Sequence, residues 1–432
     1  MTEARRLFSG VVGAVTARHA LGWLVAANAV GVLLAAELVW PALGDALAPL
    51  TYGRWMPLHM NWQLYGWCSL PLVGVLLAWC VDARHPQART HVCVALGAWS
   101  LALVAGGVAW LGGVTSGKLF LDWAGWARGA LSVAMVVLWT VCAAHAWWRR
   151  GEDGQCWTDW MRGVFLVGLL FVPGLLYWAA GREVYPSVNP DSGGATGASL
   201  LGSTLGIVMI FGLLPVMLRV PVREGGKAKC NLLGYTLVRG TGWYWWALAG
   251  SYGVFGAIDR GNTSHHAWGQ ILGLGLLIAW VPLAWIYFRR FEWEPTAWRW
   301  LGAAFGWWLV LVVTGFLTFL PGVSERLKFT NGLVAHAHLA MAGLVTAVNF
   351  VVLRQLAPRT EPRGNFWAWQ GACAVHVGVL MMMGWCEAEN AGDLFRSEMW
   401  TQALYGVRLA AGAVMLGVSV RWWAQGGARI KL

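Results

Sequence analysis

Charged residues are scarce in this sequence. Only 12% of its 432 residues are Asp, Glu, Lys or Arg, whereas an average soluble domain is about a quarter charged. Hydrophobic residues make up 58% of the chain, and they gather in runs of roughly 20 residues, the length that crosses a bilayer as a helix. This composition excludes an ordinary soluble protein and predicts an integral membrane protein.

Several common motifs and segments are also missing. The eight cysteines include no C-x-x-C and no C-x-x-C-H, which argues against a zinc ribbon, an iron–sulfur cluster or a covalently attached c-type haem. No low-complexity segment, internal repeat or long linker interrupts the apolar runs. The first run is full length and lacks an A-x-A site, so we expect no cleavable signal. We therefore expect a single membrane domain over residues 1–432.

Twelve apolar runs have the length of membrane helices, which predicts an all-α protein with twelve transmembrane helices. The expected spans are 20–43, 56–81, 90–112, 122–148, 159–180, 196–220, 240–258, 267–287, 297–320, 331–353, 366–385 and 400–422. Aromatic residues crowd the ends of several runs, as they do at membrane interfaces.

The basic residues predict the orientation. Of 31 Lys and Arg, 22 fall on the side of the two termini, seven fall on the opposite side, and Arg128 and Arg408 lie within spans. The positive-inside rule then places both termini in the cytoplasm. The net charge of +11 follows from this bias and requires no nucleic acid partner.

Histidines within the expected spans indicate a buried ligand site. In this orientation every even-numbered span runs inward, so His59 on span 2 and both His336 and His338 on span 10 lie in the outer third of the bilayer. An unpaired imidazole is costly in hydrocarbon. Imidazoles at one level on separate helices are typical of a haem or metal held between those helices.

The run "AHAHLAMAG" places His336 and His338 two residues apart. At 3.6 residues per turn, these side chains differ by about 200° and must leave opposite faces of the helix. They cannot chelate one ion, but they can ligate two groups on either side of it. The alternative is a hydrogen bond between helices. We expect such a bond for His376, and an interfacial position for His145.

Twelve spans, a histidine on span 2 and H-x-H on span 10 resemble subunit I of the haem–copper oxidase superfamily, above all its C family of cbb-type oxidases. Two further stretches share this similarity, from Trp246 to Ile286 and from Leu404 to Trp423. The resemblance implies a subunit I-like bundle in which His59 and His338 hold a low-spin haem b. It also implies that His336 holds a high-spin haem.

The resemblance extends to Arg408, which matches an arginine of the family's last span and is expected to pair with a haem propionate. A salt bridge to Glu37 is the alternative. Tyr252 falls where the family has its active-site tyrosine. We therefore expect one haem b, or two if the high-spin site is also filled.

The ligands of the family's copper ion are missing. Its three histidines are replaced by Ser203, Ile258 and Asp259, and an isoleucine cannot ligate a metal. We therefore expect no copper by the family pattern. The adjacent His265 and His266 come seven residues late and could form a nonstandard metal site only if their loop folds back.

Three functions are consistent with this pattern. The first is a haem b electron carrier of the bacterial inner membrane, working with a c-type cytochrome subunit or other membrane subunits of a respiratory complex. The second is an active oxidase or nitric oxide reductase with a rewired metal site. The third is a non-redox structural, sensor or transport subunit. A proton path through span 9 could use only Thr314 and Thr318, whose hydroxyls we expect to bond their own helix.

Overall fold

The computed structural model describes residues 3–149, 156–184, 200–223, 240–258, 266–328, 330–358, 362–389 and 399–427. This part of the chain is helical, as the sequence predicts. Its α-helices are α1 Glu3–Val39, α2 Pro41–Ala46, α3 Tyr52–Asn61, α4 Leu70–Cys80, α5 Ala88–Leu111, α6 Ala130–Trp148, α7 Cys156–Ala179, α8 Leu200–Met217, α9 Gly242–Ile258, α10 Trp268–Phe288, α11 Trp298–Phe319, α12 Ser324–Leu327, α13 Asn331–His338, α14 Thr346–Leu356, α15 Arg363–Glu389 and α16 Met399–Gly427. Three other helices are the 3₁₀-helix η2 Gly125–Ala127 and the π-helices η1 Trp62–Cys68 and η4 Leu339–Val345.

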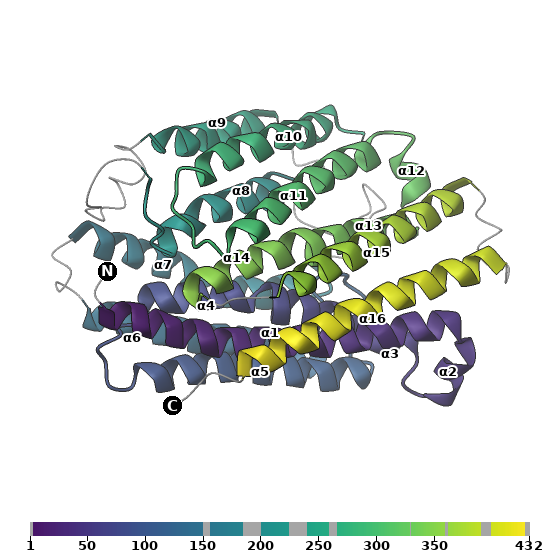
Figure 1. Ribbon diagram of the computed structural model, residues 1–432, viewed down its shortest axis with the longest axis horizontal. Helices are drawn as coiled ribbons and strands as arrows, with labels where there is room; N and C mark the ends of the chain where they lie inside the picture. The colour runs from purple at the N-terminus through teal and green to yellow at the C-terminus, as the bar shows by residue number, and fades with distance from the viewer. Residues whose placement is uncertain are drawn as a thin grey trace.

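The long helices run along one common direction and form a bundle (Figure 1). Ten segments in the described part are long and apolar enough to cross a membrane. They are Gly10–Val39, Tyr52–Cys80, Ala88–Leu111, Gly125–Trp148, Asp159–Ala179, Trp268–Phe288, Trp298–Phe319, Asn331–Leu356, Arg363–Glu389 and Met399–Gln425. The first begins ten residues before the expected boundary, because Gly10–His19 continues the same helix.

The two remaining expected spans are shorter as described. The segment 196–220 corresponds to α8, of which Leu205–Met217 is a short apolar helix, and 240–258 corresponds to the 17 residues of α9. Both are helical and apolar, so their type follows the prediction. Twelve spans therefore remain an expectation, whereas ten are present in the described ranges.

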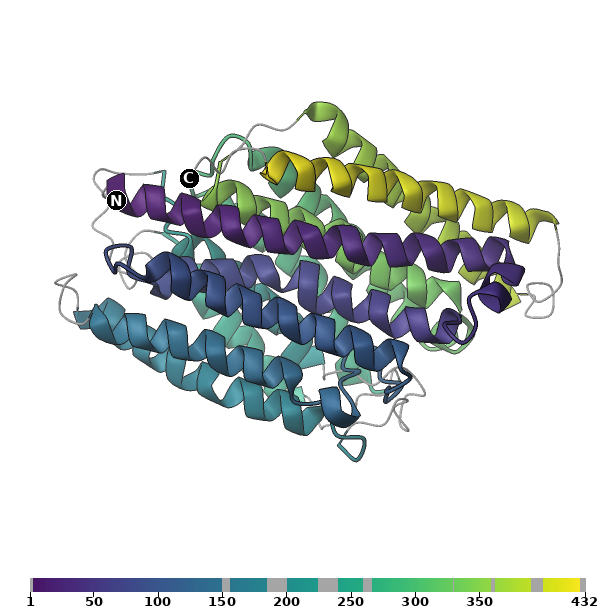
Figure 2. The ribbon, with the colours of Figure 1, turned by 90° about the horizontal axis from the view of Figure 1, so that it is seen from below.

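The first and last helices lie side by side and run in opposite directions (Figures 1 and 2). The start of α1 and the end of α16 consequently point toward the same end of the bundle. This arrangement requires an even number of crossings. Ten and twelve both satisfy that requirement.

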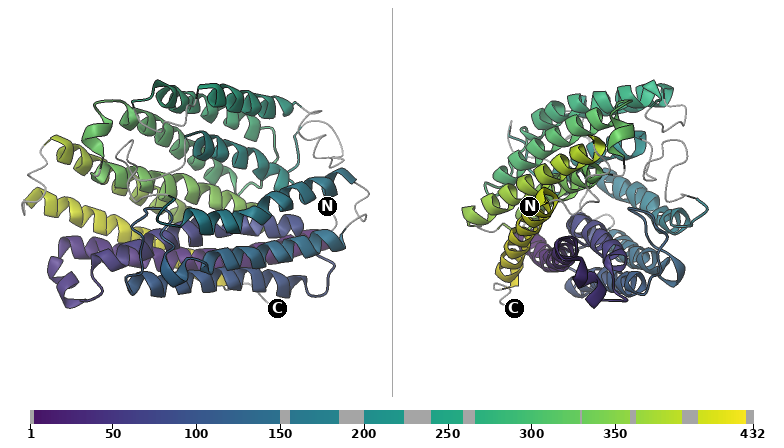
Figure 3. Two further views of the ribbon diagram at one scale, coloured as in Figure 1. Left: turned by 180° about the vertical axis from the view of Figure 1, so that it is seen from behind. Right: turned by 90° about the vertical axis from the view of Figure 1, so that its right-hand side faces the viewer.

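The segment that carries His336 and His338 lies near the middle of the bundle. Helices α9 and α10 form one edge, and α5 and α6 form the opposite edge (Figures 1 and 3). Between them, Asn331–Leu356 is the most buried of the ten spans. Buried tryptophans surround it: the indole N–H of Trp67 donates to Thr346 Oγ1 at 2.8 Å, and that of Trp369 donates to the Ala342 carbonyl at 3.0 Å. Tryptophan thus also fills the core, beyond its expected place at the interfaces.

Candidate functional site

The rings of His59 on α3 and His338 on α13 face each other inside the bundle. Their centroids are 6.4 Å apart and their planes differ by only 22°. The two residues are 279 positions apart in the sequence, and folding brings them to one level, as the sequence predicts. Both residues are half-buried between packed helices.

Each ring is held by a hydrogen bond to a backbone carbonyl. His59 Nδ1 lies 2.8 Å from the Ala27 carbonyl oxygen, and His338 Nδ1 lies 2.8 Å from that of Val334. A carbonyl only accepts, so each Nδ1 carries the proton and each Nε2 keeps its lone pair. This is the arrangement that metal-ligating histidines usually show.

The separation of the rings fits a metal between them. Two metal–imidazole bonds of about 2 Å each, together with the two ring radii, place the centroids roughly 6 Å apart. Gly31 on α1 provides the room: a Cβ at this position would approach His59 Cε1 to 2.7 Å. The pair therefore fits bis-imidazole ligation of a haem iron.

His336 points to a different neighbour. A Cβ on Gly315 of α11 would lie 3.0 Å from His336 Cε1, whereas His338 meets His59 and His376. The expected separation of the two side chains onto different faces is confirmed. His336 Nδ1 is buried without a hydrogen-bond partner among the described residues, so its tautomer is not set by a carbonyl as in the facing pair.

A π-helical segment directly follows both facing histidines. Segment η1 begins at Trp62, three residues after His59, and η4 begins at Leu339, immediately after His338. π-helical turns inside α-helices are rare and occur frequently at functional sites. Sequence periodicity did not indicate either one, because both segments are mostly apolar and an extra residue in a turn leaves little trace in such a pattern.

The start of α13 is fastened to α15. Glu387 accepts hydrogen bonds from both the backbone and the side chain of Asn331, which places a carboxylate at a helix N-terminus, where the helix dipole favours it. One turn earlier on α15, Gly384 lies so close that a Cβ would come within 2.2 Å of the Gly332 nitrogen. These contacts fix the position of α13 along α15, and with it the position of His336 and His338 along the bundle axis.

Arg408 lies beside the facing pair. Its charge acts on His59, His338 and His376, and its own electrostatic partners are Tyr52, Tyr405 and Glu387. Glu37 is not among those partners, and both of its carboxylate oxygens are buried without a hydrogen bond in the described part. The alternative salt bridge between Arg408 and Glu37 is therefore wrong.

His376 on α15 adjoins the pair, with its ring centroid 4.7 Å from that of His338. Neither of its nitrogens makes a hydrogen bond of normal geometry to a described residue, although the Arg408 backbone is near. The interaction with the Arg408 backbone on α16 is with a neighbouring helix, as expected, but it lacks the geometry of a normal hydrogen bond. His376 is a third imidazole at this level that the sequence reading did not connect with the pair.

The positions that replace the copper ligands are only partly described. Tyr252 and Ile258 lie on α9 and pack against the core, and Ser203 falls within α8, with its side chain outside the described residues. Asp259 and His265 also lie outside the described residues. His266 is exposed, and its Nε2 lies 3.2 Å from a Glu325 carboxylate oxygen. It therefore interacts with α12 in this structure.

The hydroxyls of α11 behave as expected. Thr314 Oγ1 donates to the Val310 carbonyl at 2.7 Å, and Thr318 Oγ1 donates to that of Thr314 at 2.8 Å. Both hydroxyls are therefore used by their own helix.

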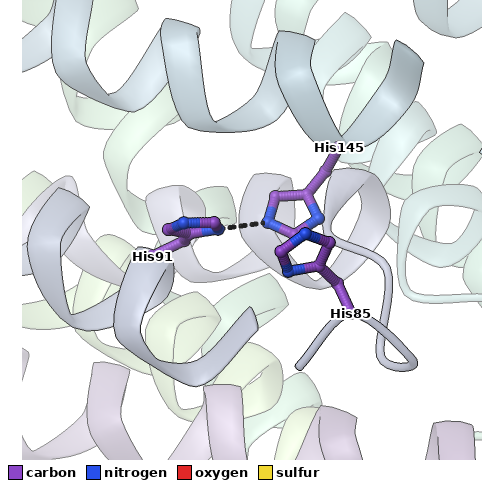
Figure 4. A group of neighbouring side chains, drawn as sticks. All are labelled: His85, His91 and His145. Atoms are coloured by element: carbon purple, nitrogen blue, oxygen red, sulfur yellow. Dashed lines mark hydrogen bonds between the residues drawn. The ribbon is translucent and has the colours of Figure 1, made fainter. Parts of the chain in front are cut away.

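A second histidine cluster lies beyond the end of Tyr52–Cys80, the span that carries His59 near its start. The ring nitrogens of His85, His91 and His145 approach within 4.8 Å of one another, the only such group of three potential metal ligands among the described residues (Figure 4). His145 is fully buried in the protein and lies in the last turn of α6, so it is at the end of its span, as expected. The available signal was a pair of histidines, His85 and His91, near the turn between two spans and a third, His145, at the end of another span.

An ionised carboxylate accompanies this cluster. Asp82 follows the end of α4, and its Oδ1 lies 3.2 Å from Arg84 Nε. Burial alone would raise the pKa of the Asp82 carboxyl, but the hydrogen bonds and charge of Arg84, together with the charge of Arg149, hold the pKa below its usual value. Asp82 is therefore negatively charged at neutral pH.

Comparisons with known proteins bear on the chain as a whole. No protein-family model matches the sequence. The chain is similar to a curated protein described as "Cytochrome c oxidase subunit 1 homolog, bacteroid" from Bradyrhizobium diazoefficiens, with 23% identity over 415 residues that cover 89% of this chain and 70% of that protein. An alignment of this length supports a distant relationship to subunit I of haem–copper oxidases.

Proposed function

We propose that this chain is a membrane haem b protein, similar to the catalytic subunit of cbb-type oxidases, that transfers electrons through a low-spin haem between His59 and His338. The observation that carries the proposal is the geometry of the pair: rings 6.4 Å apart, nearly parallel, each with its Nδ1 bonded to a carbonyl. Similarity to a cytochrome c oxidase subunit supports the same cofactor class.

The residues of this chain would position the group in two ways. The carbonyls of Ala27 and Val334 keep the proton of each ring on Nδ1, so that both Nε2 atoms are free to act as ligands, and bonds of this kind raise the basicity of a metal-ligating imidazole. His59 and His338 would hold the haem iron, which would supply one-electron transfer at this place. Arg408 supplies a positive charge beside the pair, suited to a propionate because a guanidinium binds carboxylates through two donors.

The proposal assigns no oxygen chemistry to the chain. Ile258 offers no ligand atom, His266 is engaged with Glu325, and the hydroxyls of Thr314 and Thr318 bond their own helix. His336 is the residue that would hold a second haem. Unlike the rings of the facing pair, its ring has no carbonyl that fixes the tautomer. The expected electron partner is a c-type cytochrome subunit at the outer face of a bacterial inner membrane.

Single substitutions test the assignment. Purified His59→Ala and His338→Ala variants should lose the low-spin bis-imidazole signal in the reduced-minus-oxidised optical spectrum and in low-temperature electron paramagnetic resonance. His336→Ala is the matched control, since it removes an imidazole from the opposite face of the same helix and should retain the signal. Retention of the low-spin signal in both His59→Ala and His338→Ala would contradict the proposed ligands.

A further inference from the structure

Three histidines from three different elements converge at the end of the bundle where α1 begins. His85 lies in the turn between α4 and α5, His91 lies in the first turn of α5, and His145 lies in the last turn of α6. Each offers one ring nitrogen, and these nitrogens all lie within 4.8 Å of one another. Figure 4 shows the three rings directed toward a common point.

The cluster is compact and partly covered. His91 Nδ1 and His145 Nε2 are 3.0 Å apart. Trp148 stacks on the ring of His85 with a centroid separation of 4.4 Å and an interplanar angle of 9°. His145 is fully buried, whereas His85 and His91 are half-buried. The cluster is therefore accessible on the side of His85 and His91.

From this geometry we propose that His85, His91 and His145 bind a divalent transition-metal ion of the zinc class. In a tetrahedral site with metal–nitrogen bonds of about 2.0–2.1 Å, neighbouring ligand nitrogens are roughly 3.3 Å apart. The His91–His145 separation already has this size, and the 4.8 Å limit of the group requires only small side-chain rotations. Imidazole suits zinc and copper, whereas magnesium and calcium prefer oxygen.

The hydrogen bonds of the metal-free rings leave room for the ion. The backbone N–H of Asp82 donates to His145 Nδ1 at 3.3 Å, and that of Gln87 donates to His85 Nδ1 at 3.2 Å. Both distances are at the long end for such bonds, so little is lost when the rings turn. The metal takes the place of the proton shared by His91 and His145, and the Asp82 carboxylate offsets part of the added positive charge.

The cluster is separate from the facing pair of His59 and His338. Span 2 carries His59 near its start and ends at Cys80, and the 21 residues between them correspond to roughly 30 Å of helix. A metal here would join the turn before α5 to the end of α6. Its three protein ligands leave a fourth position for water, as in open zinc sites.

Zinc binding to tag-free, full-length protein in detergent tests the proposal. Equilibrium dialysis against micromolar Zn²⁺ followed by metal analysis gives the stoichiometry, and Co²⁺ substitution gives the coordination from its visible absorption. We expect one zinc per chain and a tetrahedral Co²⁺ spectrum. His91→Ala and His85→Ala should weaken binding by about tenfold or more, since even second-shell changes cost that much.

His266→Ala is the control, because it removes an exposed imidazole outside the cluster, and it should bind zinc like the unmodified protein. A cooperative thermal unfolding transition shows that each variant is folded. Zinc bound equally by the unmodified protein and by the folded His85→Ala/His91→Ala double variant would overturn the proposal, as would no binding by a protein that melts cooperatively. Absence of haem would contradict the proposed function alone and leave this test intact.

Discussion

At the scale of single residues, the candidate site depends on small neighbours as much as on its imidazoles. Gly31 faces the edge of the His59 ring, and Gly315 faces that of His336. Glycine at these positions lets α1 and α11 approach rings that any larger residue would displace. The proximity of His59 and His338 could be predicted from the sequence because an imidazole in a membrane span is conspicuous, whereas a glycine among 56 is not.

Gly31→Ala should shift the His59 ring and lower the low-spin haem content. The new Cβ would come within 2.7 Å of His59 Cε1, and relief of such overpacking typically costs about 1–3 kcal/mol. Gly10→Ala on the same helix is the control, because nothing lies within 4 Å of its Cβ. Haem content per chain and the low-spin signal of the two variants provide the comparison; equal values would show that α1 does not constrain His59.

Arg408→Gln should lower the midpoint potential of the low-spin haem. A positive charge stabilises the reduced form, and about 1 kcal/mol of charge interaction corresponds to a shift on the order of 50 mV for one electron. Arg128→Gln is the control, since Arg128 bonds the Tyr177 carbonyl. A redox titration that gives Arg408→Gln an unchanged or higher potential would show that this charge does not act on the haem.

At the scale of elements, helix type and position followed from hydropathy, but internal geometry did not. The π-helices η1 and η4 lie within long, mostly apolar runs, where periodicity carries little signal. The His85–His91–His145 cluster was missed for a different reason. It joins a turn to two helix ends, and spacing along the sequence does not report which ends of antiparallel helices meet.

Gly384→Ala should loosen the attachment of α13 to α15. Its Cβ would meet the backbone of Gly332 at 2.2 Å, and backbone cannot move aside as a flexible side chain can. We expect a lower thermal unfolding midpoint and a reduced haem content. Gly378→Ala, on the same helix with open space at its Cβ, should leave both unchanged. Equal midpoints in the two variants would show that the close contact is not required.

At the scale of the whole molecule, the scarcity of charge correctly indicated a helical membrane bundle. Ten expected spans coincide with long apolar helices, and α8 and α9 occupy the other two positions as shorter ones. The start of span 1 was misplaced because polar residues such as Arg18 and His19 interrupt its hydropathy without ending the helix. His19 bonds Ser100 Oγ at 2.8 Å inside the bundle, and hydropathy alone does not reveal such a partner.

The central claim is that this chain holds a haem between His59 and His338. Haem quantitation on the purified, full-length protein, combined with low-temperature electron paramagnetic resonance of the oxidised form, tests it most directly. We expect one or two b-type haems per chain, with at least one giving a low-spin bis-imidazole signal. A folded protein that contains no haem, or only high-spin haem, would contradict the account.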